Sequence, residues 1–551
     1  MVSRRTLWRL TGAAAALLLT AAVLAIVLST GGSTAGSAEA ADTSTGPAAV
    51  SPGSGSGLGS AGAGAAAVVA AARTPAPSLT LSPATGAGGR PIAPGYLGFS
   101  LEFQAVRAYT GSDPRRINPV LVQLIRNLTP GQAPVLRIGG DSSDVSYAPA
   151  RGVHPPAWVS YRLTPSWMAT TAALAHALGA HMIMGLNLAA NQPALAAAEA
   201  RDYLKALGRG SLDALEIGNE PNVYSKIAVY HTVFGIPVTA RPSNYPYSTF
   251  RRQYEAVVRA LPRTTLAGPA LATGPTPGPG SWAGSMPGFL RRLPRLTTMT
   301  VHRYPLRNCN VGPANPQYPS IPHLLSEYAT GGLAASLRPW IRIAHSRHRL
   351  LRVDELNSVA CRGMPGVSDT FASALWVTDA LFSLVHAGVD GIDMHTLPNA
   401  AYQLFAFRHT GGRWQASVKP VYYGLQLFAQ AAPAGSRLIA LGRHGHAAGL
   451  STWATRAPDG TTRVVLINKS STRTRTVKVA MPGATRASVE RMLAPSISAR
   501  GAVTLGGNSY GTMTSTGVLP APHTTPVAVT GGGFAVSVPH GSAALVTIPA
   551  S

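Results

Sequence analysis

The amino-acid sequence predicts an α/β protein, a (β/α)8 TIM barrel followed by a C-terminal antiparallel β-sandwich. Eight short apolar runs alternate with segments of helical period over roughly 350 residues, which is typical of a parallel sheet wrapped by helices. Beyond about Ala432 the helical period ends, and short alternating runs are separated by turn residues such as Pro-Asp-Gly. Hydrophobic residues make up 46% of the chain and charged residues 12%, a composition that supports a large core.

The first residues have the layout of an export signal. A basic flank precedes an apolar run from Gly12 to Leu28, and cleavage after Ala40 would follow a small-x-small site. Residues 1–40 are therefore predicted to be a signal peptide, or an uncleaved signal anchor in the membrane, because the run is long. Both alternatives place the protein outside the cytoplasm. Residues 41–77 are rich in Gly, Ala, Ser, Thr and Pro and are predicted to be a flexible linker.

The barrel is expected to occupy residues 78–431 and the sandwich residues 432–551. The strands expected in the barrel are Tyr96–Leu101, Val135–Ile138, His181–Leu186, Leu212–Ile217, Thr264–Gly268, Met299–Val301, Leu350–Val353 and Gly391–Met394. The expected helices include Pro119–Asn127, Pro165–Leu178, Pro193–Leu207, Tyr247–Leu261 and Ser368–His386; three of them start at proline, whose missing N–H costs nothing at that position. The strand-like segment after Ser78 is expected to add an edge strand to the sandwich.

The end of the fourth predicted strand carries the clearest chemical signal. The segment Glu216-Ile-Gly-Asn-Glu-Pro-Asn places Glu220 at the barrel mouth, where active sites of this fold lie. An Asn-Glu-Pro at this strand end resembles the large clan of retaining barrel glycosidases, in which this Glu is the acid/base. A Glu that merely caps a turn is the structural alternative.

Retaining hydrolysis needs a second carboxylate about 5 Å from the first. The seventh predicted strand ends in Val353-Asp-Glu-Leu-Asn-Ser, and Glu355 is the expected nucleophile. Because neighbouring residues of a strand face opposite sides, Asp354 is expected to point away from the mouth.

Three further residues are expected to surround these carboxylates. Arg137, at the end of the second strand, is expected to donate hydrogen bonds to Glu355 and to keep it ionised. After the sixth strand, Tyr304 is expected to contact the nucleophile and His302 the sugar. The structural alternatives are an ion pair for Arg137 and core or rim positions for the other two.

The chain resembles glycoside hydrolase family 79, which includes β-glucuronidases and heparanases. The resemblance spans roughly residues 95–430 and rests on the stretches GYLGFSLEFQ, LRIGGDSSD, IMGLNLA, EIGNEPN, TVHRYP, VDELNS, GVSDTFASALWVTDALF and PVYYGLQLFAQ, and the β-rich tail matches the family's C-terminal domain. It implies that Glu102 contacts sugar hydroxyls, Asn219 the 2-hydroxyl and Tyr402 the sugar carboxylate. The loop after the nucleophile differs too much to align, but it offers Arg362 as a cationic partner for a carboxylate.

The only two cysteines are Cys309 and Cys361. Cys361 lies in the loop after the seventh strand and Cys309 in the loop after the sixth. Adjacent strands bring these loops together, so we expect a disulfide that stiffens the rim of the site; two unpaired thiols are the alternative.

The expected chemistry requires no cofactor and no metal, and the histidines show no metal-ligand spacing. The formal charge is +25, but the arginines are scattered without a nucleic-acid-binding motif, so nucleic acid is not an expected partner. An acidic glycan remains a candidate partner beside a simple solvated surface.

The sequence leaves three functions open. The first is an exo-acting β-glucuronidase-like hydrolase that releases a terminal uronic acid. The second is a retaining glycosidase of the same clan that acts on a neutral sugar or inside a polysaccharide. The third is a cell-surface carbohydrate- or polyanion-binding protein without catalysis, which the presence of both Glu220 and Glu355 argues against.

Overall fold

A computed structural model of the chain describes residues 77–86, 88–275 and 281–550. The predicted signal peptide or anchor and residues 41–76 of the predicted linker lie outside these ranges. Within them, no helix combines the length and the apolar character that crossing a membrane requires.

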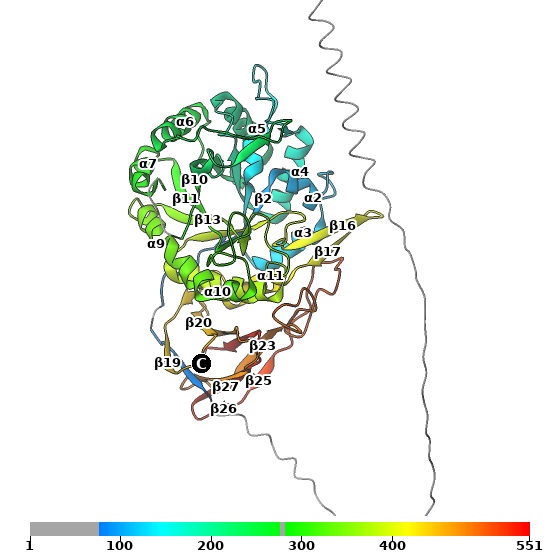
Figure 1. Cartoon of the computed structure of the whole chain (residues 1–551). Helices are drawn as coiled ribbons and strands as arrows, with labels where there is room; N and C mark the ends of the chain where they lie inside the picture. The colour runs from blue at the N-terminus through cyan, green and yellow to red at the C-terminus, as the bar shows by residue number, and fades with distance from the viewer. Residues whose placement is uncertain (1–76, 87, 276–280, 551) are drawn as a thin grey trace, which may run out of the picture. The chain divides into compact units, whose positions relative to one another are not determined.

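Eight parallel strands close into a barrel, in chain order β2, β3, β6, β7, β10, β11, β13 and β15, with β15 pairing back onto β2 (Figure 1). This arrangement confirms the predicted fold class. The strands span Leu97–Glu102, Val135–Gly139, His181–Leu186, Leu212–Ile217, Leu266–Ala272, Leu296–His302, Leu350–Leu356 and Gly391–Thr396. Each corresponds to one predicted strand, although the fifth runs from Leu266 to Ala272 instead of from Thr264 to Gly268.

Helices surround the barrel (Figure 1). Their bounds are α2 (Phe103–Thr110), α3 (Pro119–Leu128), α4 (Pro165–Leu178), α5 (Pro193–Ser211), α6 (Tyr247–Ala260), α7 (Met286–Arg292), the short α8 (Ile321–Leu324), α9 (Gly331–His345), α10 (Phe371–Ala387) and α11 (Pro420–Ala431). The starts follow local chemistry: Asn118 accepts hydrogen bonds from Val120 N and Leu121 N, and Thr164 accepts one from Trp167 N. In both cases proline follows at the first helical position.

The C-terminal domain consists of two β-sheets packed face to face on a separate apolar core. One sheet has the order β19-β1-β22-β27-β26, and the other has β18-β20-β21-β28-β23-β24, with β25 also on β23. The bounds are β1 (Leu79–Pro83), β18 (Arg437–Leu438), β19 (Leu441–Gly445), β20 (Leu450–Arg456), β21 (Thr462–Asn468), β22 (Arg475–Ala480), β23 (Ala487–Leu493), β24 (Thr504–Leu505), β25 (Thr525–Val527), β26 (Val529–Thr530), β27 (Gly533–Val538) and β28 (Ser542–Ile548).

The segment after Ser78 enters this domain at a different place from the one expected. Strand β1 is an inner strand, antiparallel to β19 and parallel to β22, instead of an edge strand. Leu79 and Leu81 alternate with polar residues and are buried in the sandwich core, which explains why a strand that precedes the barrel in the chain joins this sheet.

Helix α10 connects the two domains. Asp379 on this helix is buried and accepts hydrogen bonds from Ser451 Oγ at 2.8 Å and Trp453 Nε1 at 2.7 Å, and Lys469 Nζ lies 2.5 Å away. Phe382 stacks on Trp453 with ring centroids 5.9 Å apart. Because α10 is covered by the barrel on one side and the sandwich on the other, it is apolar almost all round and has no polar stripe.

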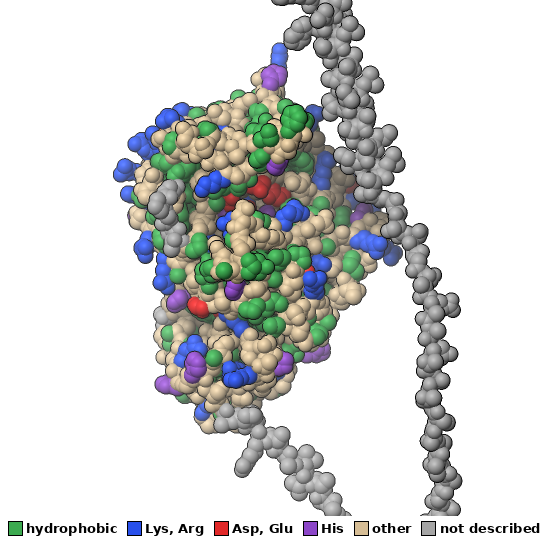
Figure 2. All heavy atoms as spheres, viewed as in Figure 1, with side chains coloured by type: hydrophobic (Ala, Val, Ile, Leu, Met, Phe, Trp, Pro, Cys, Tyr) green, Lys and Arg blue, Asp and Glu red, His purple; other side chains and the backbone are tan. Residues whose placement is uncertain are grey.

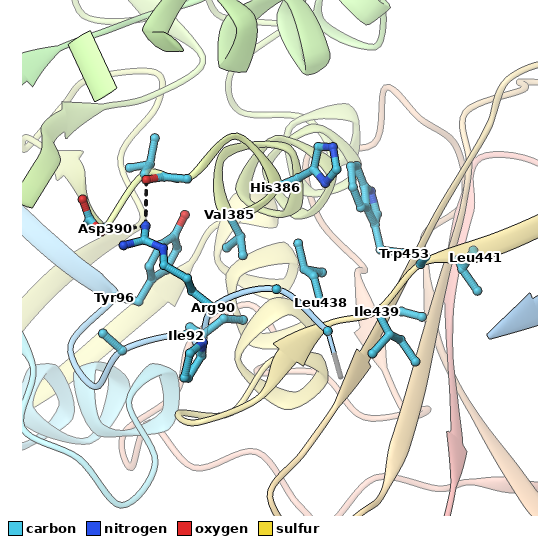
Figure 3. A pocket seen from close by; sticks show the side chains of 18 of the residues that line it. Arg90, Ile92, Tyr96, Val385, His386, Asp390, Leu438, Ile439, Leu441 and Trp453 are labelled. Atoms are coloured by element: carbon cyan, nitrogen blue, oxygen red, sulfur yellow. Dashed lines mark hydrogen bonds and ion pairs between the residues drawn. The ribbon is translucent and has the colours of Figure 1, made fainter. Parts of the chain in front are cut away.

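A cavity of about 920 Å³ lies where the start of β13 and the segments that lead into β2 and β15 approach the sandwich (Figure 3). Its lining is mostly apolar and includes Ile92, Leu438 and Trp453. Arg90 reaches across one side to Asp390, with Nη2 2.9 Å from Oδ1. The cavity is at the opposite end of the barrel from the predicted site residues.

Glu490 on β23 is buried beside Gln430 of α11, whose Nε2 lies 3.4 Å from Oε1, and burial raises the pKa of Glu490 from 4.5 to about 7. The folded protein therefore binds this proton more tightly than the unfolded chain does, and the free energy of unfolding should fall as pH rises from about 4.5 to about 7. We expect Glu490→Gln to remove this fall in the free energy of unfolding, which is at most about 3 kcal/mol at pH 8. At pH 4 the substitution should change the free energy of unfolding little. The melting temperature at both pH values measures it, with exposed Glu327→Gln as control; equal shifts at both pH values would contradict the assignment.

Candidate active site

Glu220 lies just beyond β7, on a tight turn. Gly218 has φ +79°, and a Cβ there would come 2.6 Å from the Tyr224 hydroxyl, so the turn requires glycine. Glu220 itself is left-handed, with φ 50° and ψ 47°, and its N–H donates to Ala270 O at 2.9 Å. This strained backbone presents the carboxylate to the barrel mouth, where it is 21% exposed.

Glu355 reaches the same mouth through a β-bulge in β13. Along the β11–β13 pairing, Val301 pairs with Val353, but the next residue of β11, His302, pairs with Glu355. Strand β13 therefore has one extra residue, Asp354, at this point. The expectation that Asp354 points away from the mouth is wrong. Asp354 continues the inward-facing series of β13 and lies 3.6 Å from Arg137 Nε, and the bulge turns Glu355 inward as well.

The two predicted catalytic carboxylates are close together. One oxygen of Glu220, one of Glu355 and a ring nitrogen of His302 all lie within 4.8 Å of one another. His302 is buried between the carboxylates: Nδ1 is 3.0 Å from Glu220 Oε1 and 3.7 Å from Glu355 Oε2. The structure thus places His302 in contact with Glu220 rather than only at the sugar.

Glu355 is surrounded by groups that stabilise its ionised form. Arg137 Nη1 and the Tyr304 hydroxyl each donate to it at 2.9 Å, and His395 Nδ1 lies 3.9 Å from Oε2. Burial raises the pKa of Glu355, but His395, His302 and Arg137, together with the Tyr304 hydrogen bond, outweigh burial and hold this pKa well below its usual range. Glu355 is therefore a carboxylate at neutral and mildly acidic pH, as the predicted role of nucleophile requires.

A second acidic pair lies beneath Glu355. Arg137 Nε donates to Glu216 Oε2 at 2.8 Å, and Thr300 Oγ1 donates to Glu216 Oε1 at 2.7 Å. Burial raises the pKa of Glu216, but Arg137 and other neighbours lower it to below its usual value; burial and Glu216 raise the pKa of Asp354 well above its usual range. Of the two, Glu216 therefore favours the ionised form beside Arg137, and Asp354 favours the protonated form.

Asn219 and Glu102 are fixed by the loop after β3. Asn219 Oδ1 accepts from Arg137 Nη2, and its Nδ2 donates to Asp141 Oδ1, both at 2.9 Å. Glu102 accepts from the backbone N–H groups of Asp141 and Ser142 at 3.2 and 2.8 Å, and also from the Ser142 hydroxyl. Both side chains are thus held rigidly on the rim beside Glu220 and Glu355.

Tyr402 lies over the other side of the site. Its ring packs against Tyr304 and His395, with centroids 6.2 and 5.7 Å apart. Asn357, two residues after Glu355, donates through Nδ2 to Tyr402 O and so fixes this loop. Arg362 is exposed; its Nη2 donates to Pro398 O at 3.3 Å, and its carbonyl oxygen accepts from Ala401 N at 2.8 Å.

The loops after β11 and β13 are joined twice. The short strands β12 (Leu306–Arg307) and β14 (Val359–Ala360) pair in parallel, and a disulfide links Cys309 to Cys361, with Cα atoms 6.0 Å apart. The expected bridge is thus present, and it holds the segment that carries Arg362.

Sequence reasoning missed His395, Asp141 and Glu216 as site residues. His395 is near the end of the eighth strand and touches both Glu355 and Glu102, whose Oε1 is 3.9 Å from His395 Nε2. The available signal was position: each residue lies at, or directly after, the carboxyl end of a barrel strand, where this fold carries its chemistry.

Glu220, His302 and Glu355 have the donor set of a metal site as well as that of a hydrolase. However, the guanidinium of Arg137 donates directly to Glu355, and a fixed positive charge at 2.9 Å opposes the binding of a cation there. The arrangement fits a pair of catalytic carboxylates better than a metal centre.

Tyr304→Phe tests the environment of Glu355. Without the hydroxyl donor the pKa of Glu355 should rise, so the acidic limb of the kcat/KM profile should move to higher pH, and kcat/KM should fall about ten- to a hundredfold. Rates between pH 3 and 8 measure this change. Tyr510→Phe, which removes a hydroxyl bonded to Gln426 in the sandwich interface, is the control and should leave the profile in place. An unshifted limb in Tyr304→Phe would show that Tyr304 does not tune the nucleophile.

Comparison with known proteins supports the fold and the predicted resemblance. Residues 452–545 match the model "Glycosyl hydrolase family 79 C-terminal beta domain", which confirms the resemblance at the sandwich. A 4-O-α-L-rhamnosyl-β-D-glucuronidase from Fusarium oxysporum is similar over 85% of this chain and all of that chain, with 20% identity and a TM-score of 0.67.

Other solved structures share the same fold. A family 51 arabinofuranosidase from Xanthomonas axonopodis pv. citri is 14% identical, with a TM-score of 0.59, over 86% of this chain and all of that one. A family 44 xyloglucanase from Paenibacillus polymyxa is 12% identical, with a TM-score of 0.51, over the same shares. A search of curated proteins finds no match.

Proposed function

We propose that the chain is a retaining β-glycosidase with the specificity of an exo-β-glucuronidase, in which Glu220 is the acid/base and Glu355 the nucleophile. The observation that carries this proposal is the spacing of the two carboxylates, which have oxygens within 4.8 Å of each other. Retaining enzymes hold these groups about 5 Å apart, whereas inverting enzymes keep them roughly 6.5–9.5 Å apart to admit a water molecule.

In the first step, a Glu355 oxygen attacks the anomeric carbon while protonated Glu220 donates its proton to the glycosidic oxygen. The bond between the anomeric carbon and that oxygen breaks, the aglycone leaves with the proton, and the sugar is bound to Glu355 as an ester. As the bond forms, Glu355 loses its negative charge and its hydrogen bonds from Arg137 and Tyr304 weaken. His302 remains hydrogen-bonded to Glu220.

In the second step, Glu220 acts as a base and removes a proton from a water molecule. The water oxygen attacks the anomeric carbon, the ester bond to Glu355 breaks, and the sugar leaves with its original configuration. Glu220 is protonated again and Glu355 is again a carboxylate, so the site returns to its starting state.

The uronate preference has three supports. Tyr402 packs over the site beside Tyr304, and Arg362 lies in the disulfide-bridged loop after the nucleophile. A hydroxyl and a guanidinium are suitable partners for a sugar carboxylate. The similar Fusarium oxysporum structure is a glucuronidase by its description, which agrees with this choice.

A neutral substrate is the second candidate. The arabinofuranosidase and the xyloglucanase share this fold, with TM-scores of 0.59 and 0.51 against 0.67 for that glucuronidase, and the mechanism does not depend on the sugar carboxylate. A non-catalytic binding protein is less consistent with the site, because binding alone does not require two carboxylates so close to a guanidinium.

Hydrolysis of chromogenic β-glycosides distinguishes these candidates. We expect cleavage of the glucuronide and little cleavage of the glucoside, galactoside and xyloside, with loss of activity in Glu220→Ala and Glu355→Ala. Arg362→Gln should raise KM for the glucuronide. Cleavage of a neutral glycoside alone would remove the uronate assignment and keep the mechanism, and silence across the panel would favour endo action or the binding protein.

The proposed location is outside the cytoplasm, in secreted or membrane-anchored form. The apolar run from Gly12 to Leu28 and the Cys309–Cys361 disulfide support it. Mass spectrometry of the exported protein tests it: a mature N-terminus at Ala41 indicates cleavage, an intact N-terminus in the membrane fraction indicates an anchor, and recovery only in the cytoplasm contradicts both.

A further inference from the structure

A second hollow lies beside the mouth of the barrel. It has a volume of about 820 Å³ and is formed by the end of α2, the segment that follows it, and the hairpin of β16 (Phe405–Thr410) and β17 (Arg413–Val418). In Figure 2, Lys, Arg and His side chains gather over this hairpin. We call this hollow the hairpin pocket. None of the steps derived above uses it.

The hairpin pocket carries a net positive charge. Arg107, Arg116 and Arg413 line it, against one carboxylate, Asp113. Asp113 accepts from the N–H of Arg115 and thus belongs to the local turn. Among the described residues, none of the three lining arginines forms an ion pair.

Arg107 is the part of this pocket that the protein builds most firmly. It is half-buried, Nη2 donates to Thr164 Oγ1 at 3.0 Å, and Nε is buried without a hydrogen-bond partner among the described residues. Thr164 thus orients the guanidinium, and Nη1 forms no hydrogen bond with a described residue and is not among the buried unpaired atoms, so it can donate to an anion.

An aromatic surface lies beside the arginines. Trp414 is half-buried and stacks with His409, with ring centroids 4.4 Å apart and planes 17° apart. Its indole also packs over Gly111, where a Cβ would lie 3.1 Å from the ring. Trp414 and His409 thus form an aromatic wall of the pocket beside the arginines.

The pocket is rigidly connected to the active site. Helix α2 starts directly after Glu102 and has eight residues, so its end lies about 12 Å away along the helix axis. The hairpin starts three residues after Tyr402, and Tyr109 of α2 packs on Phe405 and Phe407 with centroids 5.4 and 5.7 Å apart. Both walls therefore continue from the site's own rim.

We propose that the hairpin pocket is a binding site for an anionic sugar residue, carboxylated or sulfated, of an acidic glycan. The pocket would hold a glycan chain at the same end of the barrel as the two carboxylates. Its role in hydrolysis rests on the proposed glycosidase function, but the binding itself does not.

Binding to the full chain tests this site, in a Glu355→Gln background that prevents turnover. The probes are a hyaluronan hexasaccharide, which carries carboxylates only, a heparin hexasaccharide, which also carries sulfates, and neutral cellohexaose. The pocket variant combines Arg107→Gln, Arg116→Gln and Arg413→Gln. The matched control removes three exposed charges elsewhere, with Arg259→Gln, Arg291→Gln and Arg292→Gln.

The pocket variant is expected to weaken binding of an anionic hexasaccharide at least about tenfold, the control variant less than twofold, and cellohexaose should not bind. Binding of hyaluronan assigns the carboxylate, and binding of heparin alone assigns the sulfate; both support the site. Equal weakening in the two variants, or equal competition by single-stranded DNA, would show general attraction of polyanions and overturn it. With Glu355 restored, the pocket variant should cleave a small chromogenic glycoside normally, so a silent glycoside panel would remove the proposed function without removing the pocket.

Discussion

Glu355→Ala should abolish hydrolysis, with a loss of kcat on the order of 10⁴-fold or more, because no other described side chain is placed to form the bond to the anomeric carbon. On a substrate with a good leaving group, Glu220→Ala should lower kcat less, by about 10²- to 10⁴-fold, because such a leaving group departs without being protonated. Steady-state rates on an aryl glycoside measure both losses.

Azide distinguishes the two roles. In Glu355→Ala, azide can replace the nucleophile in a single displacement, so a β-glycoside should yield the α-glycosyl azide. In Glu220→Ala, azide should instead attack the sugar bound to Glu355 and yield the β-glycosyl azide. Exchanged products would exchange the two assignments, and wild-type rates in either variant would remove the mechanism.

Arg137→Met should cost both stability and activity. Arg137 donates to Glu216, Glu355 and Asn219, so its loss leaves two carboxylates with no compensating guanidinium. Removing one partner of a buried ion pair typically costs about 3–5 kcal/mol. We expect a comparable fall in the free energy of unfolding and, in the folded fraction, a rise in the pKa of Glu355 that moves the acidic limb upward.

Arg352→Met is the matched control. Arg352 is also buried in the barrel and pairs with Asp393 at 2.8 Å, but it does not contact Glu220 or Glu355. This variant should be destabilised to a similar degree, while its folded fraction keeps the wild-type pH profile. If both variants showed the same profile, Arg137 would be a structural ion pair only.

The sequence was sufficient for the barrel because eight buried strands leave eight apolar runs, and because proline and side-chain caps mark the helix starts. It was also sufficient to predict that Glu220 and Glu355 lie close together, because the carboxyl ends of the barrel strands meet at one end of the barrel. It was insufficient for Asp354: strict alternation assumes a regular strand, and the bulge that turns two successive acidic residues inward depends on pairing with β11.

The buried contacts among Glu216, Asp354 and Arg137 could not be predicted from the sequence either. Which of Glu216 and Asp354 holds the proton depends on the distances of each from Arg137, and those exist only after β3, β7 and β13 are placed together. The hairpin pocket is similar, because Arg107 and Arg413 are far apart in the chain and become neighbours when Tyr109 packs on the hairpin.

The inner position of β1 has a mechanical consequence. Whatever precedes Leu79 enters the folded part of the chain through the sandwich, so a pull on the N-terminal segment acts first on the β1 ladders to β19 and β22. The barrel strands would not be stretched until these ladders gave way. Under flow or surface attachment, the sandwich would take up the load, and the geometry of Glu220 and Glu355 in the barrel would be protected from force.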